Sequence, residues 1–201
     1  MNSNRSSLEK TKALVGMAIF TAIVVVLQVI ATALGRMGLT PPSLVLIPIV
    51  IGSAVYGLKT GAWLGLVFGI VVLLAGVMGA DLFTAGMWNY NPLATASICI
   101  IKGVAAGFVA GAVYKGLSKF NGILAAVAAA VVCPILNTGL FLLGAAVFFK
   151  DYLMSTYSVE AAGFIGFLFL GLVGVNFLIE MAINLVLSPM IVRILKVRKK
   201  A

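Results

Sequence analysis

The strongest constraint on this chain is its division into apolar stretches long enough to cross a membrane. Residues 122–149, for example, contain no charged side chain. A helix needs about 20 apolar residues, within a range of about 17–25, to cross the hydrocarbon core of a bilayer. The sequence therefore predicts an all-α integral membrane protein, a single domain over residues 1–201 with six transmembrane helices in one bundle. The predicted spans are residues 12–34, 42–58, 61–78, 92–115, 122–149 and 161–195.

The composition supports a membrane protein and argues against a water-soluble domain. The 201 residues are 63% hydrophobic and 9% charged, with a mean hydropathy of +1.21, whereas soluble domains carry about 25% charged residues. The first apolar run extends from Lys12 to about Leu34, which exceeds the about 7–15 residues of a signal-peptide core. We therefore expect this run to be the first span and not a cleaved signal.

The distribution of Lys and Arg predicts that both termini are cytoplasmic, because cytoplasmic segments carry an excess of these residues. With the N-terminus inside, the outer segments contain Arg36 and Lys150, and the inner segments contain eleven cations. The net charge of +9 is then explained by topology and not by binding to nucleic acid. The eleven inner cations are Arg5, Lys10, Lys12, Lys59, Lys115, Lys119, Arg193, Lys196, Arg198, Lys199 and Lys200.

Several kinds of chemistry lack the residues that they need. The chain has no His, which argues against Ser–His or Cys–His nucleophiles and His-ligated metals. The stretch GSAVYGLKTG, residues 52–61, is similar to a phosphate-binding loop, but Leu58 occupies the position that requires Lys. Cys99 and Cys133 lie in apolar segments and are expected to be small core residues. We therefore predict no catalytic activity, no metal and no cofactor.

Charged and amide side chains at membrane depth predict a polar pocket. Inserting a charge there costs about 2.5–3.5 kcal/mol, so such residues usually face an interior or a cavity. At 1.5 Å per helical residue, Lys102, Asn137, Asn176 and Glu180 reach comparable depths in three of the predicted spans. These residues can line a pocket that opens outward and binds a small polar molecule. Alternatively, Lys102 and Glu180 pair with each other and the amides only join helices.

An outer loop provides a second group of candidate binding residues. Trp88, Asn89, Tyr90 and Asn91 lie together in GADLFTAGMWNYNP, residues 79–92. They combine flat apolar faces with amide donors and acceptors, as a site for a small organic ligand requires. Aromatic residues also anchor helices at the membrane interface, so the sequence leaves both roles open.

Small residues recur every four positions in three of the predicted spans. This spacing lets helix backbones approach closely, and in lipid such packing replaces the hydrophobic effect between helices. We expect the glycines to hold the bundle together, whereas the alanines can face either a helix of this chain or another protein. The glycine rows are Gly61, Gly65, Gly69 and Gly103, Gly107, Gly111, and the alanine pair is Ala18 and Ala22.

The chain resembles the substrate-binding S components of energy-coupling factor (ECF) vitamin transporters. The likeness lies in six spans, the Ala18-x-x-x-Ala22 pair, and the stretches LIPIVIGSAVYGLKTGAWLGLVFG, NPLATASICIIKGVAAGFVAGAVYK and NFLIEMAINLVLSPMIVRIL. The resemblance implies a multi-pass protein of a bacterial plasma membrane that captures a water-soluble vitamin outside. It also implies docking, through Ala18 and Ala22, onto a membrane coupling subunit that carries two ATPase subunits. The implied pocket residues are Lys102, Asn137, Asn176 and Glu180, with Trp88, Asn89, Tyr90 and Asn91 from the outer loop.

The resemblance is greatest to pantothenate-type S components, which makes pantothenate the candidate ligand. Lys102, with Arg36 near the outer mouth, suits a carboxylate, and the amides suit hydroxyl and amide groups. Riboflavin, folate or another vitamin stays an alternative. A different function is a self-contained ion- or proton-coupled carrier or channel that uses Lys102 and Glu180 as a relay.

Overall fold

The computed structural model describes residues 2–37 and 44–200, without the side chains of residues 2–9, 175–176, 190–192 and 194–200. The described chain is helical, as predicted, and contains no strand. Its elements are α1 (Asn2–Arg36), α2 (Leu46–Tyr56), α3 (Leu58–Val77), α4 (Leu82–Tyr90), α5 (Pro92–Leu117), α6 (Gly122–Phe148), α7 (Lys150–Tyr157), η1 (Ala161–Gly163), α8 (Phe164–Gly166), η2 (Phe167–Val173) and α9 (Gly174–Lys200).

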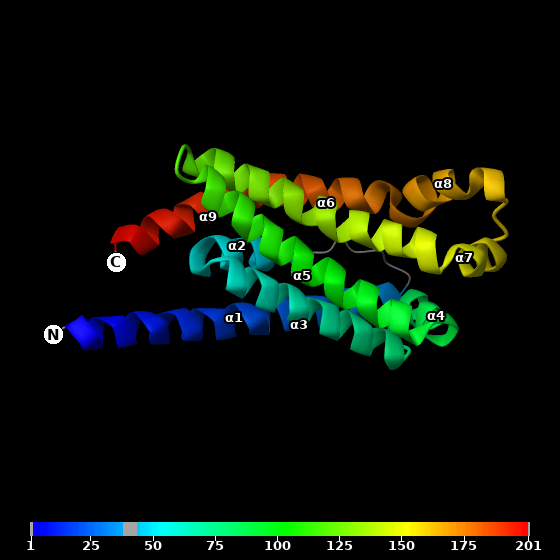
Figure 1. The fold of residues 1–201 in the computed structure, drawn as a ribbon, viewed down its shortest axis with the longest axis horizontal. Coiled ribbons are helices and arrows are strands. Elements are labelled where there is room, and N and C mark those ends of the chain that lie inside the picture. Colours follow the sequence, from blue (N-terminus) through cyan, green and yellow to red (C-terminus); the bar gives the residue numbers. More distant parts are fainter. Residues whose placement is uncertain (1, 38–43, 201) are drawn as a thin grey trace.

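The long helices form one bundle and run roughly along a common axis (Figure 1). Within it, α5 packs against both α3 and α6, α9 packs against α6, and α1 packs against α2 and α3. The two termini and the α5–α6 turn lie at one end of the bundle, and α4 and α7 lie at the other. The segments that the sequence predicts to be cytoplasmic therefore share one end of the molecule.

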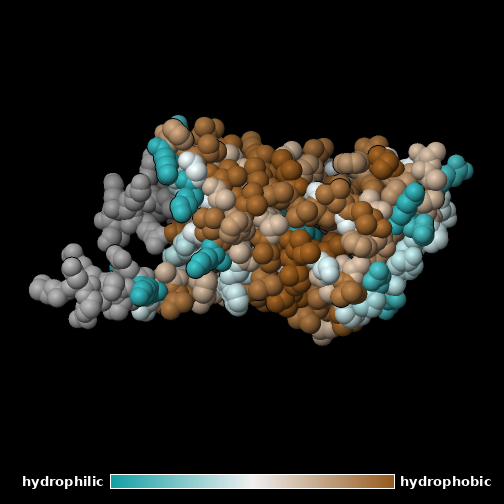
Figure 2. Space-filling model, viewed as in Figure 1, coloured by the Kyte–Doolittle hydropathy of each residue, from teal (hydrophilic) through white to brown (hydrophobic). Residues whose placement is uncertain are grey.

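Four helices are long and apolar enough to cross a membrane, namely Lys10–Arg36 of α1, α3, α5 and α6. A fifth candidate consists of α7 and Ala161–Val173, which are bent by 108° relative to each other. Figure 2 shows a broad hydrophobic band across the middle of the molecule, with hydrophilic residues towards both ends. The chain is therefore a multi-pass membrane protein.

Two of the six predicted spans are not continuous long helices. The predicted span at residues 42–58 corresponds to α2, which has only 11 residues; residues 42–43 lie outside the described chain. The predicted span at residues 161–195 is interrupted between the π-helical segment η2 and α9. Gly174 at this junction has φ 32° and ψ −132°, a conformation that favours glycine. The count of six spans therefore stays a prediction.

Both predicted outer loops contain helices, which corrects the sequence interpretation. The carboxylate of Asp81 accepts hydrogen bonds from the backbone N–H groups two and three residues further on, and α4 begins there. Asn91 caps α5 by accepting a hydrogen bond from Ala94 N at 3.1 Å. Such caps satisfy N–H groups that a helix start leaves unpaired. In the second loop, α7 occupies residues 150–157.

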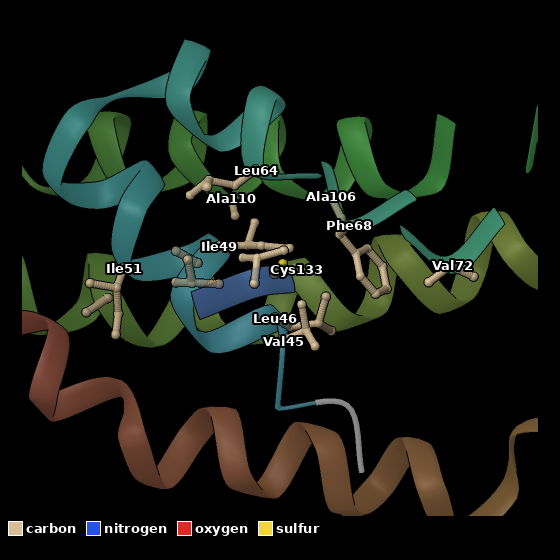
Figure 3. Close-up of a cluster of buried hydrophobic side chains, with 14 of the residues drawn as sticks. Val45, Leu46, Ile49, Ile51, Leu64, Phe68, Val72, Ala106, Ala110 and Cys133 are labelled. Atoms are coloured by element: carbon tan, nitrogen blue, oxygen red, sulfur yellow. The ribbon is translucent and has the colours of Figure 1, made fainter. Parts of the chain in front are cut away.

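The short helix α2 lies inside the bundle and forms the centre of the main hydrophobic core (Figure 3). Leu46 and Ile49 of α2 are fully buried, as are Leu64 of α3 and Cys133 of α6 in the same cluster. Cys99 is also buried, and both cysteines are free thiols. This placement confirms that the cysteines are small core residues.

The two glycine rows face each other along α3 and α5 and form a seam between these helices. A Cβ added to Gly65 would collide with the carbonyl of Gly103, and one added to Gly103 would collide with the carbonyl of Gly65. The same holds for Gly61 and Gly107. The helix backbones therefore touch directly, which confirms the packing role predicted for the glycines. We call Gly61, Gly65, Gly69, Gly103 and Gly107 the glycine seam.

Candidate binding cavity

A cavity of about 530 Å³ lies in the half of the bundle that is remote from the two termini. Its walls come from the C-terminal ends of α1 and α3, the start of α4, the middle of α5, the C-terminal half of α6 and the η2–α9 junction. This volume falls within the range of about 300–1,000 Å³ that is typical of sites for small molecules. The charged and amide residues in its lining are Gln28, Arg36, Asp81, Lys102, Asn137 and Glu180.

Lys102 reaches this cavity from the middle of α5. Its Nζ lies 5.0 Å from the ring centroid of Phe141 and 5.9 Å from that of Phe68. An aromatic face attracts a cation by about 0.5–2 kcal/mol. Glu180 lines the same cavity, so the alternative of a Lys102–Glu180 pair stays open. The rings hold the cation in the cavity wall without neutralising its charge.

Asn137 contributes a buried acceptor to the same cavity from α6. The side chain is 8% exposed, and its Oδ1 has no hydrogen-bond donor within the described part of the chain. An unpaired buried acceptor costs about 1–3 kcal/mol. Pro134 lies one turn earlier and has no N–H to donate, yet α6 continues through it as one helix. Asn137 lines the cavity, so its amide is a candidate hydrogen-bonding group for a ligand there.

Three polar residues of α9 recur every four positions, so they lie on one face of this helix. Glu180, Asn184 and Ser188 are all buried. Glu180 lines the cavity, whereas Asn184 Nδ2 donates to the backbone carbonyl of Glu180 at 2.8 Å and Ser188 Oγ donates to that of Leu185 at 2.8 Å. The deeper two residues therefore serve the helix itself. The side chain of Asn176 lies outside the described residues, so its place in the pocket stays a prediction.

The described lining of the cavity does not include the four residues predicted from the outer loop. The ring of Tyr90 lies 5.1 Å from that of Tyr152 and 6.0 Å from that of Phe149, between centroids. Asn91 is occupied as the cap of α5. Tyr90 therefore packs within an aromatic cluster, and Asn91 serves as a helix cap. The binding role of the group stays a prediction for its four residues: Trp88, Asn89, Tyr90 and Asn91.

A polar row on α1, which the sequence did not predict as part of the site, also lines the cavity. Gln28 and Thr32 line the cavity, and Gln28 Nε2 donates a hydrogen bond to Thr32 Oγ1 at 3.4 Å. They precede Arg36 by eight and four residues, so all three residues lie on one face of α1. Asp81 was also missed, but its carboxylate already accepts from Thr84 Oγ1 at 2.6 Å and caps α4.

Ala18 and Ala22 lie on an uncovered face of α1. Both are exposed, and the neighbouring apolar side chains Leu14, Val15 and Ile19 are each more than half exposed. Only 11% of the most apolar stretch of α1 is buried, compared with 39–44% in α3, α5 and α6. This face is therefore directed at lipid or at another protein, and not at a described helix of the chain.

The fold and the cavity together define a class: a helical, multi-pass membrane protein with a polar cavity for a small molecule. A family model, the ECF transporter, substrate-specific component, matches residues 12–192. The chain therefore belongs to the family of ECF transporter substrate-specific components. Such components are substrate-binding transport subunits and not enzymes, and they associate with the subunits of an ECF module. No curated protein and no solved structure gives a match.

Proposed function

We propose that this subunit captures a water-soluble vitamin or vitamin precursor on the outside of a bacterial plasma membrane. The proposal includes six membrane crossings with both termini in the cytoplasm. Delivery then depends on a membrane coupling subunit and two ATPase subunits. Support for the orientation comes from the cationic segments, which share the end of the bundle opposite to the cavity. The cavity would then face outward.

The observation that carries this proposal is the pairing of Lys102 with Asn137 in one cavity wall. Lys102 offers an ammonium held over the rings of Phe68 and Phe141, and Asn137 offers a buried oxygen without a described donor. A molecule that carries an anionic group and a hydroxyl or amide N–H would satisfy both. The rings of Phe68 and Phe141 would cover its apolar part.

Pantothenate has this combination of groups and is the candidate ligand that we propose. Its carboxylate would meet Lys102, and one of its hydroxyl or amide hydrogens would meet Asn137 Oδ1. Glu180 lines the same cavity and is part of the proposed site. It would accept from a second donor of the ligand. We retain Asn176 in the proposed site from its position at the start of α9.

Ala18 and Ala22 are the proposed contact with the coupling subunit. Their exposure on the least buried long helix supports this role. Two small side chains one helical turn apart let a partner helix approach the backbone closely, which is how helices associate in lipid.

The test is identification of the ligand. The protein is purified in mild detergent and denatured, and released vitamins are identified by mass spectrometry; pantothenate and a vitamin panel are then titrated. In Lys102→Met we expect the dissociation constant to rise about 10–100-fold, because a hydrogen bond to a charged group contributes about 1.5–3 kcal/mol. Lys115→Met, in the last turn of the same helix and outside the cavity lining, is the matched control and should bind normally.

Two results would contradict the proposal in different ways. Nanomolar binding of another vitamin without binding of pantothenate would disprove the ligand but keep the function. An empty protein that binds no vitamin, and that transports a solute in liposomes without any ATPase, would favour the self-contained carrier.

A further inference from the structure

A second cavity, of about 440 Å³, lies between α6 and the junction of η2 with α9. In the described part of the chain, its lining contains no charged side chain, and its one hydroxyl comes from Thr138. Thr138, Val173 and Phe177 also line the candidate binding cavity, so these side chains lie between the two cavities. The second cavity is therefore an apolar neighbour of the polar one. We call it the apolar groove.

The apolar groove opens towards lipid and not towards water. Leu170 is 82% exposed, and Phe169 and Leu178 are each 59% exposed, although all three line the groove. Ile135 lines it from the middle of α6, which is long and apolar enough to cross a membrane. The mouth of the groove therefore lies at a depth where the surroundings are hydrocarbon. A polar molecule would lose its hydrogen bonds to water there and regain few from this lining.

The shape of the groove suits a single alkyl chain better than a helix of another protein. Gly139 and Gly174 both line it, and a Cβ added to either would meet nothing within 4 Å. Helices approach each other closely where small residues recur every four positions, but the residues four positions from these glycines are large. They are Ile135, Leu143, Leu170 and Leu178. These side chains would hold a helix, which is about 10–12 Å wide, away from the glycines, whereas an alkyl chain fits between them.

We propose that an acyl chain of a membrane phospholipid occupies the apolar groove. An empty groove would leave its lining without contacts on one side, and an acyl chain supplies these dispersion contacts. The chain would lie against Thr138, Val173 and Phe177 from the lipid side. It would thereby support the wall that these residues share with the binding cavity. The inference does not depend on the identity of the vitamin or on its binding.

The groove can be tested by photolabelling in a bilayer. The full chain is reconstituted into phosphatidylcholine vesicles that contain a phosphatidylcholine with a diazirine in its acyl chain. After illumination, lipid adducts on residues 169–178 are quantified by mass spectrometry of peptides. Gly139→Phe fills the groove from α6. We expect it to lower labelling of residues 169–178 about fivefold, because a filled cavity leaves no space for the chain.

Gly122→Phe is the matched control, because it lies in the same helix, outside the groove, and a Cβ there also meets nothing within 4 Å. It should label like the parent, and the exposed face of α1 at Leu14 and Ile19 should label equally in all variants. Unchanged labelling in Gly139→Phe, or an equal fall in Gly122→Phe, would overturn the proposal.

Two further measurements separate this site from the proposed function. If saturating pantothenate abolishes labelling of residues 169–178 in the parent, the groove belongs to the vitamin and the lipid proposal is wrong. A protein that binds no vitamin but loses labelling in Gly139→Phe would disprove the proposed function and keep the lipid site. Thermal melting verifies the fold of each variant, and Gly139→Leu carries the test if Gly139→Phe does not fold.

Discussion

The glycine seam and the binding cavity lie next to each other and are packed in opposite ways. Along the seam, α3 and α5 meet backbone to backbone, with no side chain between Gly65 and Gly103. Around the cavity, long side chains leave about 530 Å³ unfilled. Gly103 and Lys102 are consecutive residues of α5, so one faces the seam while the next reaches the cavity. Rigid packing on one face of α5 therefore holds a charge in place on the adjoining face.

Adding a single methyl group to the seam should have the largest effect on stability. In Gly103→Ala, the new Cβ collides with the backbone of Gly65, which no side-chain rotation can relieve. We expect the free energy of unfolding to fall by about 3 kcal/mol, at the upper end of what overpacking costs. Thermal melting in detergent would show this as a lower melting temperature. Gly116→Ala in the same helix, where a Cβ meets nothing within 4 Å, should melt unchanged or slightly higher. Equal melting temperatures for Gly103→Ala and Gly116→Ala would contradict the direct backbone packing along the glycine seam.

A substitution on the cavity side should change affinity without loss of stability. Asn137→Leu removes the buried acceptor that has no described donor. We expect vitamin affinity to fall about tenfold, while the empty protein gains up to about 1 kcal/mol because an unsatisfied group is removed. Titration and thermal melting measure the two effects. A destabilised variant would instead show that Asn137 serves the fold.

The α4 side of the cavity should depend on a local cap. Asp81→Ala removes the acceptor for the first N–H groups of α4 and for Thr84 Oγ1. Such a loss costs about 1 kcal/mol, and a lower melting temperature would reveal it. Asp151→Ala, in the first turn of α7 and exposed, is the control and should change stability by less than about 0.5 kcal/mol. If both variants melt alike, the cap of α4 contributes nothing.

The smallest effect on stability is expected at Ala18 and Ala22, the exposed small residues of α1. Ala22→Leu enlarges a side chain that is already exposed, so stability should change by less than about 0.5 kcal/mol. Co-purification with the ECF module should nevertheless be lost, because the larger side chain keeps the partner helix away. Val26→Leu, on the same exposed helix, is the control and should retain the module. If the Ala22→Leu variant still co-purifies with the ECF module, Ala18 and Ala22 are not part of the interface.

Much of the fold could be predicted because membranes impose strong local rules. Hydropathy identified the long helices, and glycine spacing predicted close helix packing, which the structure places between α3 and α5. Depth along each helix brought Lys102, Asn137 and Glu180 to one level, and all three line one cavity. The helix α4 was missed even though Asp81 and Asn91 are typical caps, because the segment between them was interpreted as a loop. The break at Gly174 has no comparable sequence signal, since glycine is also frequent within membrane helices.

By itself, the sequence determined that the chain is a helical membrane protein and which of its residues are polar at depth. These properties depend on composition and on spacing along one helix, so they are local. Only the tertiary structure decided that Lys102 lies over two rings, that Tyr90 packs against Tyr152, and that Arg36 bonds to the α3–α4 turn. Each of these contacts joins residues that lie far apart in the sequence. Their distance depends on how the helices rotate and pack against one another, and this is a property of the whole bundle.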